Sequence, residues 1–390
     1  MASSTREAVF AVEGLLSARD AASLEAIWKG FQTYRASSTR RPAQPPTPAP
    51  PARSGRFFRR RPAKTESAVS AAPSAGVLRG GSPFRPNLAP RADAGRNFVR
   101  TGGRMGRGGE SADDLRARND YFRESYAVAG KSLVAGAEAM LAHRGLAKAA
   151  QRLHGHRIVE PQVVYANILL PGQELGLHTD VPEFRMTPGS NVPLWLRVVM
   201  RQSGKFERWR LRVATAVICV HECHGGDFAY YPAGPDGPAA TIQPSANSAV
   251  VLEAESLFHG VDTVGGDDAA SPPVRGGSVL RYRGDDTWDL VASDAEAEVP
   301  VASYASSEVR FSASWKAFCF ESRSDRGSWR DHTDDLRVED VLPVLLEDMG
   351  SRGVLTDGGS GLDDRELGLR LIDEYVHFPP VGEPPETEDL

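Results

Sequence analysis

The sequence has few cysteines and no long apolar run. Only three of its 390 residues are cysteine, and a small odd number in a long chain favours a reducing compartment without a disulfide framework. No stretch approaches the roughly 18 consecutive apolar residues that a membrane-spanning helix needs. A secretory apolar core is also lacking, and the early acids Glu7, Glu13 and Asp20 disagree with an acid-poor transit peptide. We therefore expect an intracellular protein, cytoplasmic or nuclear, without membrane contact.

Acidic residues are almost missing from one segment. Between Ala36 and Gly109 the chain has fifteen Arg and Lys against two acids, Glu66 and Asp93, whereas the whole chain has a net charge of −5. Pro, Gly and Ser are frequent there and large apolar side chains are few, so burial cannot offset the entropy lost on ordering. We predict a disordered basic linker over residues 36–109. Its expected partners are nucleic acid or an acidic protein, bound weakly.

The spacing of apolar residues divides the rest of the chain. It predicts a short helical segment over residues 1–35, flanking helices over 110–160 and a C-terminal helical region over 322–390. Residues 161–321 instead contain short β-branched and aromatic runs separated by Gly and Pro. The predicted strands are Val163–Leu170, Leu194–Met200, Arg212–Val220, Asp227–Tyr231, Ala249–Leu252 and Val309–Phe320. This order predicts an antiparallel sandwich or barrel with helices outside, which a chain starting near Gly109 would retain.

A His-x-Asp pair and a distant histidine indicate a metal site. His178 and Asp180 close the predicted strand region that begins at Val163, and His259 follows the apolar run Ala249–Leu252. Residues i and i+2 of a strand point the same way, so His178 and Asp180 can hold one ion together, with His259 arriving from a second strand. Two imidazoles and one carboxylate are the ligand set that holds Fe(II) on one face and leaves the other face open.

Two other motifs imitate metal sites. His332 and Asp334 repeat the His-x-Asp pattern, but they precede an apolar run with helical spacing, where Thr and Asp are favoured for capping. A Cys-x-His-x-Cys-His tetrad from Cys219 to His224 contains zinc-ligand residue types, yet Cys319 is the one further cysteine. We interpret the first motif as a helix start and the second as a strand end followed by a turn.

Four segments carry a resemblance to a known family. The stretch from Val163 to Asp180, then Gly225–Phe228, Ser256–Val261 and Arg310–Ser312, resembles the Fe(II)/2-oxoglutarate-dependent dioxygenase superfamily. The resemblance covers about two-fifths of the chain, from Val163 to Phe320. It implies a mainly β fold: a double-stranded β-helix (jelly-roll, cupin-like) core over residues 161–321, with flanking α-helices and the disordered N-terminal segment added to it.

The resemblance also implies cofactors and roles. His178, Asp180 and His259 would bind Fe(II) at one mouth of the barrel, and 2-oxoglutarate and dioxygen would be cosubstrates. Arg310 and Ser312 alternate onto one strand face, where the guanidinium can take the far carboxylate of 2-oxoglutarate through two parallel hydrogen bonds.

The choice of arginine has a rival in the sequence. Family members place their basic residue nearer to the distal histidine, and we interpret residues 265–273 and 285–298 as inserted loops that lengthen this gap. Arg281 is the alternative. Asn167 matches an asparagine that contacts the cosubstrate in the similar alkylation-repair demethylases, whereas Leu169 stands where those enzymes have tyrosine.

The resemblance implies an oxidoreductase that hydroxylates or demethylates an unidentified small molecule or protein and releases succinate and carbon dioxide. Residues 181–191, beside the metal pair, are expected to form a lid over the substrate. Two alternatives remain open. A cupin-like protein would bind metal without 2-oxoglutarate turnover, and a nucleic-acid demethylase would use residues 36–109 to recruit its substrate.

Overall fold

The structure, a computed structural model, describes residues 9–31, 33–36, 76–77, 83–84, 117–187, 192–233, 238–266, 268–292, 299–355, 362 and 364–376. The predicted linker 36–109 lies outside these residues, apart from Ala36 and two short paired strands, β3 (Gly76–Val77) and β4 (Pro83–Phe84).

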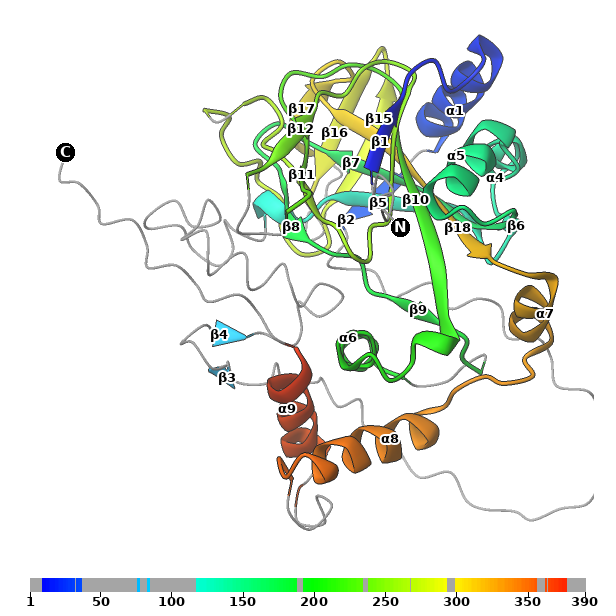
Figure 1. Cartoon of the computed structure of the whole chain (residues 1–390). Coiled ribbons are helices and arrows are strands. Elements are labelled where there is room, and N and C mark those ends of the chain that lie inside the picture. The colour runs from blue at the N-terminus through cyan, green and yellow to red at the C-terminus, as the bar shows by residue number, and fades with distance from the viewer. Residues whose placement is uncertain are drawn as a thin grey trace, which may run out of the picture.

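Two antiparallel sheets form the central barrel (Figure 1). The smaller sheet has the order β12 (Ala240–Ile242), β11 (Phe228–Tyr231), β14 (Phe258–Val261) and β8 (Leu175–His178). The larger sheet contributes β13 (Ser248–Leu252), β10 (Arg210–Cys219), β18 (Arg310–Phe320) and β7 (Ile158–Leu169), again in spatial order. Side chains of both sheets pack together between them, including Phe228 and Ile242 from one and Val217 and Val250 from the other.

The path of the chain identifies this barrel as a double-stranded β-helix. Successive strands alternate between the sheets: β7 is followed by β8, then β10, the hairpin β11–β12, β13, β14 and finally β18. Each turn of the chain thus adds strands to both sheets, and all neighbouring pairs are antiparallel. The fold predicted from the resemblance is confirmed by this topology.

The two faces of the larger sheet differ in chemistry because side chains alternate along each strand. The outer face of β18 carries Phe311 and Trp315, both at most 1% exposed. Helices α1 (Ala18–Gly30), α4 (Ala137–Leu141) and α5 (Arg144–His154) cover this face (Figure 1). The inner face of β18 carries Arg310, Ser312 and Ser314, all buried and all polar. The apolar outer face therefore packs against the helices, and the polar inner face lines the interior of the barrel.

The N-terminal segment, predicted to be helical, contains two strands as well as a helix and is part of the core. Strand β1 (Val9–Val12) pairs with β13, and β2 (Thr33–Ala36) pairs with β5 (Phe122–Val128) and with β15. Between β1 and β2, Ser17 caps α1 by accepting from the Asp20 amide. Trp28 of α1 stacks on Phe311 with ring centroids 4.3 Å apart. These contacts remove the basis for expecting that a chain starting near Gly109 would keep the fold.

Three further sequence predictions are wrong in whole or in part. Helices were expected over residues 110–160, and α4 and α5 are helices there, but β5 and β6 (Lys131–Ser132) are strands, because β5 satisfies its backbone against β7. Leu194–Met200 lies in helix α6 (Leu194–Ser203), whose buried Leu196, Val199 and Met200 have helical spacing. Of the two expected loops, the described residues of 265–273 contain no strand, but 285–298 contains a strand, Thr287–Val291, which belongs to a three-stranded meander.

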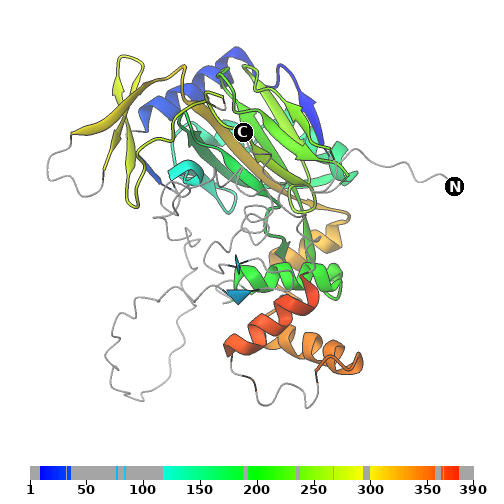
Figure 2. The same cartoon turned by 90° about the vertical axis from the view of Figure 1, so that its left-hand side faces the viewer.

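The meander extends the larger sheet beyond the barrel. It comprises β15 (Val279–Gly284), β16 (Thr287–Val291) and β17 (Pro300–Ala305), and β15 pairs with β2. Figure 2 shows these yellow strands projecting from one side of the molecule. Trp288 of β16 is fully buried and stacks on Trp28, so the insertion is tied to the core through α1.

A second apolar core lies below the barrel (Figure 1). Its helices are α6, α8 (Val338–Ser351) and α9 (Asp364–Tyr375). Helices α8 and α9 lie in the region 322–390, which was predicted to be helical. Helix α7 (Arg323–Asp331) connects β18 to them, and β9 (Glu183–Phe184) pairs with β10 above a 3-10 turn at Glu207–Trp209. No helix within the described ranges is long and apolar enough to cross a membrane.

Candidate metal centre

Three side chains converge from β8, from the residues that follow it and from the neighbouring strand β14. His178 ends β8 and pairs in register with His259 of β14, with ring centroids 4.4 Å apart. Asp180 follows two residues after His178, and its Oδ1 lies 3.9 Å from the Nε2 of His178. One ligand atom from each residue lies within 4.8 Å of the other two. Across the described part of the chain, no other group of three or more His, Cys, Asp or Glu meets this condition.

Hydrogen bonds fix which nitrogen each imidazole presents to an ion. The Nδ1 of His178 donates to the Gly176 carbonyl at 2.7 Å, and the Nδ1 of His259 donates to the Leu257 carbonyl at 2.8 Å. Each ring therefore presents Nε2 as its metal ligand, in the arrangement common to metal-binding histidines. Both side chains are buried, which limits their alternative orientations. The donor set and its geometry fit a divalent ion such as Fe(II).

Lys316 holds the third ligand in place, and the sequence prediction missed it. Its Nζ lies 2.5 Å from Oδ2 of Asp180, and the Asp180 amide donates to the Ala254 carbonyl at 2.7 Å. Oδ1 of Asp180 is the oxygen that faces His178. Burial lowers the pKa of Lys316, but the Asp180 carboxylate outweighs burial and raises it, so the amine is charged. The signal was available, because Lys316 continues the alternation of Arg310, Ser312 and Ser314.

Arg310 is buried in the same barrel, and one of its three guanidinium nitrogens lacks a hydrogen-bond partner among the described residues. Arg310 is 3% exposed. Its Nε donates to the Gly226 carbonyl at 2.8 Å and its Nη1 donates to Oγ of Ser312 at 3.1 Å. Its Nη2 is buried and has no hydrogen-bond partner among the described residues. Gly226 permits this position, because a Cβ there would lie 2.7 Å from Cδ of Arg310.

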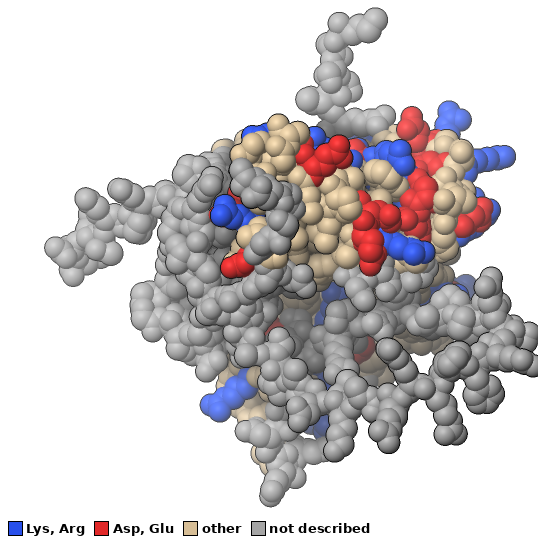
Figure 3. All heavy atoms as spheres, turned by 90° about the horizontal axis from the view of Figure 1, so that it is seen from below, with Lys and Arg blue, Asp and Glu red and all other residues tan. Residues whose placement is uncertain are grey.

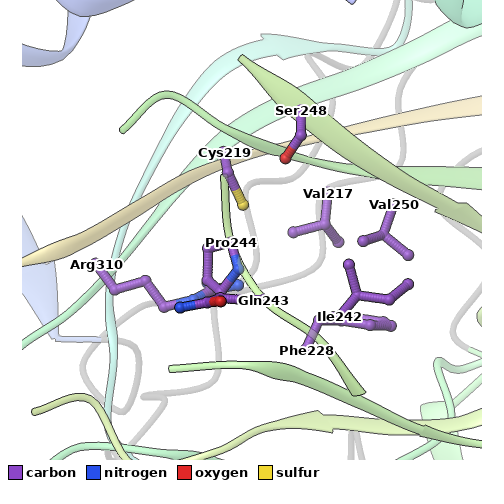
Figure 4. Close-up of a pocket in the computed structure, with 9 residues that line it drawn as sticks. All are labelled: Val217, Cys219, Phe228, Ile242, Gln243, Pro244, Ser248, Val250 and Arg310. Atoms are coloured by element: carbon purple, nitrogen blue, oxygen red, sulfur yellow. The ribbon is translucent and has the colours of Figure 1, made fainter. Parts of the chain in front are cut away.

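A small pocket lies beside this guanidinium (Figure 4). Its walls come from both sheets and are mostly apolar: Val217, Cys219, Phe228, Ile242, Gln243, Pro244, Ser248 and Val250. Phe228 also stacks on the His259 ring at 5.7 Å, which connects the pocket to the metal ligands. A buried N–H without an acceptor costs about 1–3 kcal/mol, so an anionic group in the pocket would relieve it. The Nη2 of Arg310 therefore offers a hydrogen bond to a carboxylate, such as the far carboxylate of 2-oxoglutarate.

Asn167 faces the same interior. It lies opposite Ser312 across β7 and β18, and its Nδ2 donates to Oγ of Ser314 at 3.2 Å. Its Oδ1 is buried and lacks a partner within the described ranges. Leu169 lies opposite Arg310 and is 2% exposed, so this position contributes an apolar wall.

The structure separates the two candidate arginines. Arg281 lies on β15, opposite Thr33 and Asp289, in the meander outside the barrel. Arg310 lies on β18, inside the barrel. The metal pair, Asn167, Ser312 and Arg310 are thus brought together, and Arg281 is not.

The two imitating motifs have structural roles, but the interpretation of the first as a helix start is wrong, because His332 caps the end of α7 and α8 begins only at Val338. His332 ends α7 with a left-handed backbone, and its Nδ1 lies 2.6 Å from Oδ2 of Asp335. Asp334 accepts two hydrogen bonds from Arg185, at 3.0 and 2.9 Å. In the Cys-His tetrad, the Nε2 of His221 donates to the Val309 carbonyl at 2.8 Å, and its ring stacks on Trp28. Neither motif forms a metal cluster among the described residues.

The described part of the expected lid, residues 181–187, is tied to its surroundings. Strand β9 within it pairs with β10, and Met186 forms a bridge with Leu336. Arg185 is 6% exposed and donates to Asp325, Asp334 and the Arg208 carbonyl. Residues 188–191 lie outside the described ranges.

No family model matches the chain, and no curated protein matches it. Among solved structures, it is similar to a 2OG-Fe(II) oxygenase family oxidoreductase from Burkholderia pseudomallei, at 13% identity over 52% of this chain and 68% of that chain, with a TM-score of 0.29. The α-ketoglutarate-dependent epimerase SnoN from nogalamycin biosynthesis shares 11% identity over 80% and 79% of the two chains, with a TM-score of 0.35. A prolyl hydroxylase from Trichoplax adhaerens shares 10% over 83% and 87%, with a TM-score of 0.33. These values are low, so the functional proposal rests on this chain's own residues.

Proposed function

We propose that this protein is an Fe(II)- and 2-oxoglutarate-dependent oxygenase that hydroxylates or demethylates a small-molecule or protein substrate. One observation carries the proposal. A His-Asp-His cluster and a buried arginine with an unsatisfied N–H face the interior of the same double-stranded β-helix. A metal binder that did not use a dicarboxylate would gain nothing from the second feature, which costs stability when it is empty.

The residues of the site would have three roles: binding the metal and 2-oxoglutarate, orienting a metal ligand, and excluding water. His178, Asp180 and His259 would hold Fe(II) through two nitrogens and one oxygen, and Lys316 would keep the Asp180 carboxylate turned toward the ion. Arg310 and Ser312 would bind the far carboxylate of 2-oxoglutarate. Fe(II) and 2-oxoglutarate, when bound, supply the means to activate dioxygen for attack on a C–H bond, with succinate and carbon dioxide as products.

Apolar side chains keep this chemistry dry. Phe228 covers one side of the His259 ring, and Leu169 lies opposite Arg310 on the neighbouring strand. A low local dielectric strengthens the ionic contacts that hold both the metal ligands and the dicarboxylate.

The test is succinate release from the full chain supplied with Fe(II), 2-oxoglutarate and dioxygen. Slow release without added substrate is expected, and it should stop when Fe(II) is removed with a chelator. Metal binding without any release of succinate would favour the cupin-like alternative.

The nucleic-acid alternative depends on residues outside the described ranges. On the face in Figure 3, Lys and Arg lie among Asp and Glu over the described residues, and no continuous basic surface is visible there. Stimulation of succinate release by methylated oligonucleotides, but not by small molecules, would favour this alternative.

A further inference from the structure

A cationic and aromatic cluster lies on the inner face of the larger sheet beside the candidate metal centre. Arg123 of β5 lies opposite Asn167, which in turn lies opposite Ser312 of β18. Directly opposed residues share a face of the sheet, so Arg123 faces the same interior as Arg310. The Arg123 guanidinium lies flat on the Tyr165 ring, with its central carbon 3.6 Å from the ring centroid.

Arg123 has hydrogen-bonding capacity to spare. Its Nε is buried and has no hydrogen-bond partner in the part of the chain that the structure describes. Burial disfavours the charged guanidinium, yet Tyr165, Tyr121 and Asp180 outweigh burial and raise the pKa of Arg123. The guanidinium is therefore charged and stacked on one face. Tyr121 forms a hydrogen bond with this side chain, and Nε is left without an acceptor among the described residues. A guanidinium N–H that lacks an acceptor can bind a carboxylate or a phosphate.

Among the described residues, the cations around the centre outnumber the carboxylates. Arg123 and Lys316 both interact with Asp180, and Glu183, which also interacts with Lys316, pairs with Arg197 at 2.9 Å. The proposed divalent metal and dianionic 2-oxoglutarate cancel one another. Positive charge therefore remains on the Arg123 side of Asp180, where a low dielectric makes it costly.

We propose that Arg123, stacked on Tyr165 beside Asp180 and Lys316, binds an acidic group of the substrate, a carboxylate or a phosphate. Asp180, a proposed metal ligand, interacts electrostatically with both Arg123 and Lys316, so Arg123 lies near the metal centre. The remaining atoms of a substrate held by Arg123 would then lie over the metal. This inference rests on the proposed function for naming the anion a substrate group. Anion binding itself does not depend on turnover.

The experiment uses three probes that share a ring and differ in charge: benzoate, phenyl phosphate and benzamide. Their dissociation constants are measured by calorimetry on the full chain loaded with Fe(II) and saturating 2-oxoglutarate, without oxygen. Bound 2-oxoglutarate occupies Arg310, so that arginine does not contribute. We expect one anion to bind at least about tenfold more tightly than benzamide, as a charge-assisted hydrogen bond contributes. The tighter of the two anions identifies the acidic group.

Two arginine variants locate the effect. Arg123→Met keeps an apolar side chain on Tyr165 and should abolish the preference for the anion, whereas Arg281→Met, in the meander, should retain it. Retained 2-oxoglutarate binding shows that Arg123→Met is folded, and Arg123→Lys, which keeps the charge, should recover part of the preference. The proposal is overturned if wild type binds benzamide as tightly as both anions, or if Arg123→Met keeps the preference. Failure of wild type to release succinate would instead contradict the proposed function.

Discussion

Lys316 and Asp180 form a buried ion pair at the candidate metal centre, with Nζ 2.5 Å from Oδ2. The lysine binds one carboxylate oxygen, and the other oxygen, Oδ1, faces His178. Lys316 thereby selects the orientation in which Asp180 can share an ion with both histidines. Mutation of a residue that hydrogen-bonds to a metal ligand commonly lowers metal affinity by about 10- to 100-fold.

Lys316→Met should therefore weaken Fe(II) binding by about 10- to 100-fold, because Asp180 loses the group that orients it. Equilibrium dialysis without oxygen measures the dissociation constant. Lys205→Met, at a lysine whose side chain is 45% exposed, is the matched control and should leave the dissociation constant unchanged. Unaltered affinity in Lys316→Met would show that the ion pair does not position the ligand.

Arg310→Met should raise the 2-oxoglutarate concentration needed for half-maximal succinate release by about tenfold or more, since charge-assisted hydrogen bonds contribute about 1.5–3 kcal/mol. Fe(II) affinity should change little, because the guanidinium is not a ligand. Arg281→Met should behave as wild type. The opposite pattern would mean that the dicarboxylate binds elsewhere.

Trp28→Ala should lower the free energy of unfolding by about 3–5 kcal/mol, as expected for a fully buried aromatic side chain. Trp28 is 1% exposed and stacks on Phe311, Trp288 and His221, so its loss opens a cavity between α1 and the sheet. Urea denaturation measures the change, and Leu133→Ala, at a side chain 60% exposed, should cost less than about 0.5 kcal/mol. A small effect of Trp28→Ala would revive the view that the N-terminal segment is dispensable.

Glu255 should make stability depend on pH. Burial raises the pKa of this carboxyl to about 8 from its ordinary 4.5, despite Arg210 at 3.2 Å. The folded chain then holds a proton that the unfolded chain releases, so the free energy of unfolding should fall as the pH rises from about 4.5 to about 8. Glu255→Gln cannot titrate and should flatten this part of the urea-denaturation profile. An unchanged slope would assign the dependence to other groups.

Local pattern was enough to find the metal pair and Arg310. The His-x-Asp spacing of His178 and Asp180, and the alternation that puts Arg310 and Ser312 on one face of β18, are properties of a few consecutive residues. Lys316 was missed because a lysine late in an aromatic strand is usually solvated, and its partner is 136 residues away.

Distant contacts decided the elements that the sequence did not predict. Leu194–Ser203 is an apolar run that fits a strand or a helix, and packing against α8 and α9 selects the helix. Strand β1 exists because β13 offers a sheet edge, 237 residues later in the register of Val12 with Ala249. The meander likewise exists because its strand β15 pairs with the edge of β2.

The most direct test of the central claim is whether 2-oxoglutarate binding requires the metal. Without oxygen, calorimetry on the full chain should show tight binding of 2-oxoglutarate only after Fe(II) is added, because one site holds both. His178→Ala and Asp180→Ala should lose binding of Fe(II) and of 2-oxoglutarate, whereas His332→Ala, in the second His-x-Asp copy, should keep both. Equal affinity for 2-oxoglutarate with and without Fe(II), or equal loss in His332→Ala, would contradict the account.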